Sequence, residues 1–416
     1  MKIRDLLSVN TNLPRPPAKN PKPANKKALS LLTLEPYPKP QLLPNSDKIR
    51  HDESNRSHLF PQKPKTCRLA PKEPKKTDFS PSQIISSIKE NGIIDGFAAT
   101  TDQGLFRDYN EDRVTIILNI NKPLNRANEI WPKCSFFAVY DGHGGSACCD
   151  FLRDNLHQFV TRNPLFPQNP KEALLQGFAQ AESTFMQYAL SMNPIDTSGS
   201  CAVVILIVSE NCYVANLGDS RAVMSGDNGK KTYALSKDHK PGNPSEKQRI
   251  ENSGGRVYQT WHTVNQQKLQ GPDRILPGRL SVSRSFGDAK AKLVEFGGMP
   301  EVLSSVPDVK VFKVLPDHDF IVIGCDGIFD KLSSKEVVLS VNKEIFQWCL
   351  DNGGSGEGEV DVHRMCAVGA EGVMKAAVKE GTMDNITVVV IGLNGLVRKV
   401  RNFTQSLVKE APTKIE

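Results

Sequence analysis

Short apolar runs and longer amphipathic stretches share the chain from about residue 81 onward. The runs SFFAVY, CAVVILIV, DFIVIG and NITVVVIGL are rich in β-branched residues and are typical of buried strands. CAVVILIV and the following CYVANLGDSRAVM, bridged by residues 209–211, predict two strands of an antiparallel hairpin.

Helical periodicity lies between these strands. Residues 148–160 and 174–188 each carry an apolar stripe with helical spacing. Ser333 and Glu336 fit a capping box ahead of another stripe, and a last helix is predicted from near residue 362 to 379. The glycine-rich residues 352–359 predict a loop. Because the strands come partly as hairpins, the pattern favours an α+β fold with antiparallel sheets and helices packed outside.

The first 80 residues differ from the rest in charge and composition. They contain 17 Lys and Arg against 7 Asp and Glu, whereas residues 81–416 carry a net charge of about −3. Their many Pro and Lys residues predict a disordered basic arm, which is either simply solvated or available to bind an acidic partner. A domain over residues 81–396 and a C-terminal tail over 397–416 complete the predicted organisation. Such uneven charge argues against a uniformly basic nucleic-acid-binding protein.

Cysteine usage bears on the compartment. The nine cysteines have no CxxC pair and no regular spacing, which favours reduced thiols and a cytoplasmic or nuclear protein. The longest apolar run, residues 201–208, is too short to span a membrane, so no transmembrane segment is expected.

Acidic residues fall at the ends of predicted strands, in the motifs FRDYNEDRV, VYDGHGG, NLGDSRAV, IGCDGIFD and TMDNITVVV. One such Asp alone is explained as well by a turn or a helix N-cap. Five together predict a cluster of like charges, which is costly unless a cation neutralises it. Carboxylates and backbone carbonyls suit Mg²⁺ or Mn²⁺, while Zn²⁺ would call on Cys and His. Gly142 and Gly144 let the main chain approach such an ion closely.

These motifs, together with DTSGSCAVV, HKPGNPSEKQRIENSGG and PGRLSVSRSFGD, resemble the metal-dependent type 2C protein serine/threonine phosphatases of the PPM superfamily, in the family's order over about residues 92–393. The resemblance implies a four-layer α-β-β-α sandwich of two antiparallel sheets and a catalytic domain over residues 81–396. It also implies a monomer that acts on phosphoprotein substrates.

The resemblance further implies a site for two Mg²⁺ or Mn²⁺ ions. Asp141 is expected to bridge the two ions. Glu111 and the carbonyl of Gly142 are expected to hold one ion, and Asp326 and Asp384 the other. In such sites a shared water attacks phosphorus in line, and the ions neutralise the phosphoryl oxygens.

Further residues take implied roles in the same reaction. Asp112 is expected to act through water, and Asp219 with Asp330 to form a weaker third metal site. Arg107 is expected to bind the substrate phosphate, as its planar fork permits. His143 is expected to protonate the leaving alkoxide as a general acid, the alternative being a loop histidine that only forms hydrogen bonds.

Two departures from the family pattern stand out. Cys201 replaces a common Thr, which removes a hydroxyl near the core. Residues 255–279, where the family has a flap beside the active site, form a long segment in which Tyr258 and Trp261 either contact a partner or pack inward.

Three rival interpretations were weighed. A cysteine-nucleophile phosphatase is excluded, because no Cys is followed by a phosphate-binding loop and an Arg six positions later. A catalytically inactive scaffold or regulator is disfavoured, because every matched side-chain ligand is acidic. Nucleic-acid binding through the basic arm would appear as salt-dependent binding by residues 1–80.

Overall fold

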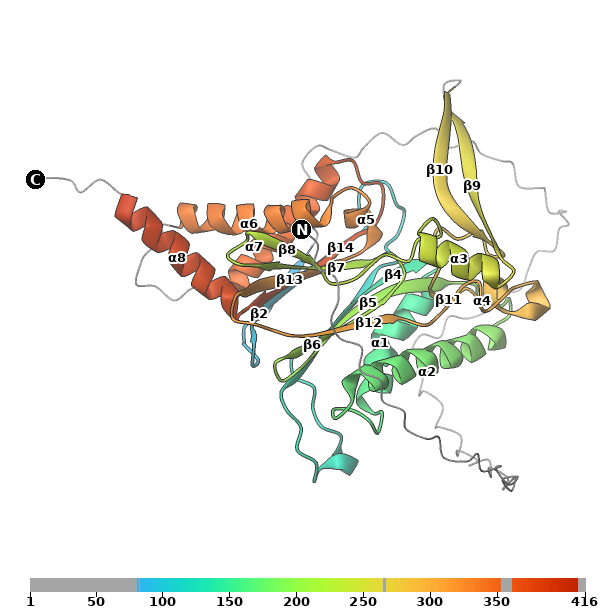
Figure 1. Ribbon diagram of the computed structural model, residues 1–416, viewed down its shortest axis with the longest axis horizontal. Coiled ribbons are helices and arrows are strands. Elements are labelled where there is room, and N and C mark those ends of the chain that lie inside the picture. Colours follow the sequence, from blue (N-terminus) through green and yellow to red (C-terminus); the bar gives the residue numbers. More distant parts are fainter. Residues whose placement is uncertain (1–80, 82, 265–266, 353–360, 411–416) are drawn as a thin grey trace, which may run out of the picture. The chain divides into compact units, whose positions relative to one another are not determined.

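The computed structural model describes residues 81, 83–264, 267–352 and 361–410. The predicted arm over residues 1–80 lies outside the described residues, as does nearly all of the predicted loop at 352–359. The described part contains two large antiparallel sheets flanked by helices (Figure 1).

Each sheet is antiparallel throughout its named strands. The first sheet has the order β1 (Ile84–Ser86), β2 (Ile94–Asp102), β14 (Ile386–Leu393), β13 (His318–Gly324), β7 (Arg221–Gly226) and β8 (Lys231–Ala234). The second has the order β12 (Asp308–Lys313), β6 (Asn211–Leu217), β5 (Gly199–Val208), β4 (Cys134–His143) and β3 (Arg113–Ile117), and the short β11 (Phe286–Gly287) pairs with β5.

Helices cover the outer face of each sheet. α1 (Ala147–Thr161) and α2 (Pro170–Ser191) share a hydrophobic core with the second sheet. α6 (Ser334–Asp351), α7 (Val362–Lys379) and α8 (Asn394–Glu410) share another with the first sheet. A third core, which includes Phe137 and Ile321, lies between the sheets. The predicted four-layer α+β sandwich is confirmed (Figure 1).

The remaining elements lie outside the two large sheets and their covering helices. They are η1 (Leu124–Arg126), α3 (Pro244–Asn252), β9 (Arg256–Val264), β10 (Gln267–Leu276), α4 (Ala289–Lys292), η2 (Val294–Phe296) and α5 (Asp326–Phe329). The long segment at 255–279 is therefore mostly a two-stranded hairpin, β9–β10, which projects from the body beside α3 and α4 (Figure 1).

Local predictions fared differently for helices and strands. The capping box is confirmed, since the Ser333 amide donates to Glu336 Oε2 at 2.7 Å and the Glu336 amide to Ser333 Oγ at 3.3 Å. The helix predicted from near residue 362 to 379 is confirmed as α7, but it is not the last, because α8 follows it. The predicted antiparallel hairpin is confirmed as β5–β6, but the continuation of its second strand through GDSRAVM is wrong, because β6 ends at Leu217 in one sheet and β7 begins at Arg221 in the other.

The reason for this break is Gly218, whose φ of 106° turns the chain between the sheets. The run SFFAVY likewise does not stop at Tyr140. β4 continues through the polar residues Asp141 to His143, which pair with Cys201 to Gly199 of β5. Asp219 therefore lies in a turn instead of within a strand, whereas Asp141 and His143 lie within a strand instead of after it.

The predicted boundary after residue 396 falls inside α8. Leu396 and Val400 are buried in the core that α8 shares with the first sheet. The Lys399 ammonium is also buried, 3.6 Å from Asp319 Oδ2. Among the residues described, no helix combines the length and apolar character that a membrane span requires.

Candidate active site

A cavity of about 750 Å³ opens where strands of both sheets end. Asp141 enters it from β4, Asp326 from the start of α5 after β13, and Asp219 from the turn between β6 and β7. Each of these three side chains offers a carboxylate oxygen, and the three oxygens lie within 4.8 Å of one another. The structure thus brings together acids that are spread over 186 positions of the sequence, Asp141 to Asp326 inclusive.

The electrostatics of this cluster are unfavourable without a cation. Burial, and then the neighbouring carboxylates, raise the pKa of Asp141 and of Asp326 well above the ordinary value. Burial also raises the pKa of Asp112 to about 6. Asp112 Oδ2 is buried and has no hydrogen-bond partner in the described part of the chain. A group of hard oxygen donors with this much excess negative charge fits divalent cations such as Mg²⁺ or Mn²⁺.

Gly142 is required by a close approach of two backbone segments. A Cβ at this position would lie 2.5 Å from the carbonyl oxygen of Glu111, nearer than such atoms can come. The Glu111 side chain meets the same turn, because Oε1 accepts a hydrogen bond of 2.6 Å from the Gly145 amide. The structure therefore places Glu111 and Gly142 side by side, as the predicted metal site needs.

Hydrogen bonds of the Asn385 side chain connect the segment that contains Glu111 to the segment that contains Asp384. Its Oδ1 accepts from the Glu111 amide at 3.0 Å, and its Nδ2 donates to the carbonyl oxygens of Gln103 and Tyr109 at 2.9 and 3.0 Å. Sequence reasoning did not single out Asn385. Its place directly after Asp384 in the motif TMDNITVVV was the available signal.

Arg107, which is predicted to bind the substrate phosphate, lies at the rim of the cavity. Its Nη2 donates to Asp384 Oδ2 at 2.6 Å, and its side chain is 46% exposed. Asp384 thus faces both the acidic cluster and a cation of the chain itself.

The two acids of the predicted third metal site share a lysine. The Lys240 ammonium lies 2.5 Å from Asp330 Oδ1 and 3.7 Å from Asp219 Oδ2. Burial alone would lower the pKa of Lys240, but the two carboxylates raise it above the ordinary value. This part of the site therefore carries a positive charge of its own, which a third metal ion would have to displace.

His143 is paired with an acid that sequence reasoning missed. Its Nε2 lies 3.0 and 2.9 Å from the two carboxylate oxygens of Asp288, and Ser285 Oγ donates to Asp288 Oδ2 at 2.6 Å. Burial lowers the pKa of His143, but Asp288 outweighs it, so the pKa lies above the usual value. The available signal was the position of Asp288 at the end of PGRLSVSRSFGD.

Gly199 makes room for this pair. A Cβ on Gly199 would come within 2.2 Å of Asp288 Oδ2 and 2.4 Å of His143 Nε2. A glycine is thus needed directly beneath the two side chains.

Comparison with known proteins gives one consistent result. The family model described as "Protein phosphatase 2C" matches residues 99–386, a range that contains every predicted site residue. The integrin-linked kinase-associated serine/threonine phosphatase 2C of Mus musculus is 31% identical over 299 residues, covering 68% of this chain and 69% of its own. A probable protein phosphatase 2C of Caenorhabditis elegans is 35% identical over 268 residues, covering 63% and 67%.

Solved structures agree at the level of the fold. A serine-threonine phosphatase 2C from Toxoplasma gondii matches with a TM-score of 0.54 at 22% identity, covering 75% of this chain and 99% of that one. A sex determining protein of C. elegans matches with a TM-score of 0.59 at 21% identity, covering 76% and 69%.

Proposed function

Because the chain belongs to the protein phosphatase 2C family of serine/threonine phosphatases, we propose that it hydrolyses phosphoserine and phosphothreonine in proteins, with two bound divalent cations. The observation that supports this best is the buried group of Asp141, Asp219 and Asp326, whose oxygens lie within 4.8 Å of one another. Burial, and then the neighbouring carboxylates for Asp141 and Asp326, raise the pKa of these groups, so bound divalent cations would favour their ionised forms.

The residues around this group suit two Mg²⁺ or Mn²⁺ ions. In this proposal Asp141 would serve both ions, Glu111 and the Gly142 carbonyl would hold one, and Asp326 and Asp384 would hold the other. When bound, such ions supply a nucleophilic water of lowered pKa and neutralise charge on the phosphoryl oxygens. The unpartnered Oδ2 of Asp112 is available to accept a hydrogen bond from water.

Arg107 is proposed to hold the substrate phosphate. A guanidinium has five N–H donors, and the hydrogen bond from Arg107 Nη2 to Asp384 Oδ2 uses one of them. The others can bind phosphoryl oxygens as a planar fork while the link to Asp384 fixes the side chain.

His143 is proposed to give a proton to the leaving alkoxide. Because Nε2 faces Asp288, Nδ1 is the ring nitrogen left for the substrate. Asp288 orients the ring and favours its protonated form, which a general acid needs. Asp288 is therefore a positioning residue in this proposal.

The test is turnover of a phosphothreonine peptide with Mn²⁺ or Mg²⁺ against EDTA. Asp326→Asn should lose roughly 10³-fold or more in kcat, because a ligand of the cluster is gone. The matched control is Asp154→Asn, which changes an acid that lies exposed on α1. Absence of turnover by folded, metal-loaded wild type would contradict the proposal and favour a non-catalytic binding role.

A further inference from the structure

At least seven of the fourteen arginines in the described part of the chain have an ion pair with a carboxylate. Arg113 pairs with Asp150 at 2.7 Å, and Arg221 with Asp238 at 2.6 Å. Three cations that line the cavity on the side of the hairpin β9–β10 have no such partner among the described residues.

These three cations are Arg274, Arg279 and Lys290. None of them makes an ion pair with a carboxylate in the described part of the chain, and Arg279 and Lys290 are exposed. Arg274 Nη1 donates to the carbonyl oxygen of Arg279 at 2.7 Å, which ties the two arginines together. The cavity therefore has an acidic floor and one flank of unneutralised positive charge.

The backbone holds Arg279 at this flank in an uncommon conformation. Its φ is 62°, in the left-handed region that residues with a side chain rarely adopt. Two hydrogen bonds close the turn, from the Arg279 amide to the Ile275 carbonyl at 2.9 Å and from the Ile275 amide to the Leu280 carbonyl at 3.0 Å. Such a conformation at an exposed residue without a carboxylate partner points to a functional constraint on that side chain.

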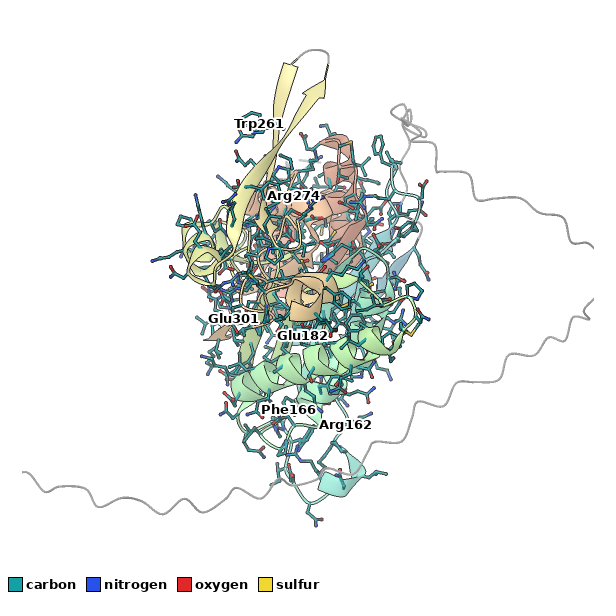
Figure 2. The ribbon with its side chains drawn as sticks, turned by 90° about the vertical axis from the view of Figure 1, so that its right-hand side faces the viewer. Arg162, Phe166, Glu182, Trp261, Arg274 and Glu301 are labelled. Carbon is teal, nitrogen blue, oxygen red and sulfur yellow. The ribbon has the colours of Figure 1, made fainter. Side chains whose placement is uncertain are left out.

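The cavity continues along the hairpin as a second groove of about 500 Å³. Arg274, Leu276 and Arg279 line both, and Tyr258 and Thr260 extend the groove along β9. Figure 2 shows Arg274 near the base of the hairpin and Trp261 farther toward its tip, and Trp261 is 60% exposed. An extended peptide that places its phosphate in the cleft can therefore run past these cations.

We propose that Arg279, together with Arg274 and Lys290, forms an anion subsite for the residues that flank the phosphorylated Ser or Thr of a substrate. This inference rests on the proposed function and specifies its substrate class as phosphopeptides with acidic or additionally phosphorylated flanks. Guanidinium forks match carboxylate and phosphate oxygens, so both kinds of flank share the recognising chemistry.

The test compares three phosphothreonine peptides that differ only in their flanks, which carry Glu, Gln or Lys on both sides. For the wild-type full chain with Mn²⁺, kcat/KM should be about tenfold higher for the Glu peptide than for the Gln peptide at low salt, and the ratio should fall at high salt. A fourth peptide with a second phosphothreonine in the flank distinguishes phosphate from carboxylate recognition.

Charge reversal gives the sharpest variant. In Arg279→Glu the Glu-peptide preference should disappear and the Lys peptide should become the better substrate. The matched control is Lys343→Glu, the same charge change at an exposed residue of α6, which should keep the wild-type ratio. Equal kcat/KM for Glu and Gln peptides in an active wild type would overturn the subsite and leave the proposed function standing.

Measurement of peptide binding distinguishes failure of the subsite from failure of the proposed function. Fluorescence anisotropy with labelled peptides and Asp326→Asn measures the flank preference without turnover. Tighter binding of the Glu peptide, lost in the double variant with Arg279→Glu, supports the subsite even if hydrolysis fails. No turnover by wild type on any peptide overturns the proposed function, and equal anisotropy for Glu and Gln peptides overturns the subsite.

Discussion

Two groups of buried carboxylates in this domain have opposite surroundings. In the cleft, Asp141 and Asp326 face other acids, and their pKa values rise. Glu246 on α3 is equally buried, but it contacts Arg284 at 2.6 Å, Arg249 at 2.9 Å and Ser283 Oγ at 2.7 Å. Burial would raise the pKa of Glu246, and these partners lower it to about 2.

Asp308, an exposed acid that shares Arg284 with Glu246, follows the same rule. Asp308 accepts from His239 Nε2 at 3.1 Å and from Arg284 at 3.0 Å, which lowers its pKa to about 2 although partial burial opposes this. Acids with a structural role, such as Glu246 and Asp308, are thus neutralised by cations of the chain itself. In the cleft the chain leaves acids in excess, which is the arrangement of a site that receives cations from outside.

The largest expected effect is that of Asp141→Asn. Turnover should fall by roughly 10³-fold or more, because the residue central to the cluster no longer carries charge. In EDTA the same variant should unfold at a higher temperature than wild type, because one of several like charges is gone. Kinetics with Mn²⁺ and thermal unfolding in EDTA check the two parts. A lower unfolding temperature in EDTA would contradict the comparison.

Glu246→Gln should act in the opposite direction on stability. It leaves Arg249 without its charged partner and Arg284 with Asp308 alone, and breaking such a mostly buried pair costs about 2–4 kcal/mol of the free energy of unfolding. Urea unfolding measures it. The control is Glu301→Gln, which changes an exposed acid nearby and should stay within about 0.5 kcal/mol of wild type. A cost as small as that of the control would mean that the network is not stabilising.

The stability of the metal-free protein should depend on pH in two opposite ways, one from the acids of the cleft and one from the acids that the chain neutralises. Asp112 has a pKa of about 6 in the folded state against 3.8 in the reference state, so the folded state binds the extra proton. The stability from this group is therefore lost as pH rises from about 4 to 6. Glu246 and Asp308 have folded pKa values of about 2, so their contribution is lost as pH falls from about 4 toward 2.

Thermal unfolding in EDTA between pH 3 and pH 8 checks these signs. Stability should pass through a maximum near pH 4 to 5, and added Mn²⁺ should move the maximum upward, since it offsets the repulsion among ionised acids. A metal-free protein that gains stability steadily from pH 4 to pH 7 would go against the interpretation of the cleft.

Substitution of Lys240 should give the smallest and most informative effect. Lys240 is a cation of the chain, yet it lies in the cleft between Asp219 and Asp330. Lys240→Met removes the ammonium between Asp219 and Asp330 and turns a neutralised pair into an unneutralised one. Mn²⁺ should then bind there about three- to tenfold more tightly. Electron paramagnetic resonance of free Mn²⁺ during a titration counts the bound ions. Unchanged binding would show that the lysine does not compete with metal.

The sequence predicted the acids of the site better than their partners. Asp141, Asp326 and Asp384 stand out because each interrupts or borders a long apolar run, and a family resemblance adds their roles. The pairing of His143 with Asp288 joins residues 145 positions apart and depends on the space that Gly199 leaves. No local pattern encodes such a distance.

The position of Asp219 was also obscured locally. The apolar residues on both sides of Gly218 continue one strand pattern, yet β6 and β7 belong to different sheets. The alternation of apolar and polar residues shows only that alternate side chains are buried. It does not show which of the two sheets a strand belongs to. The change of sheet depends on the φ of Gly218 and on its packing against Cys201, which only the folded chain reveals.

That change of sheet determines when the active site can form during synthesis on the ribosome. The cluster takes Asp141 from the second sheet, Asp326 from the end of a strand of the first, and Asp219 from the crossing between them. Asp384 precedes β14, which lies between β2 and β13. A nascent chain can build the second sheet early, but the first sheet stays divided until β14 has emerged. An active phosphatase therefore cannot exist before almost the whole domain has been synthesised.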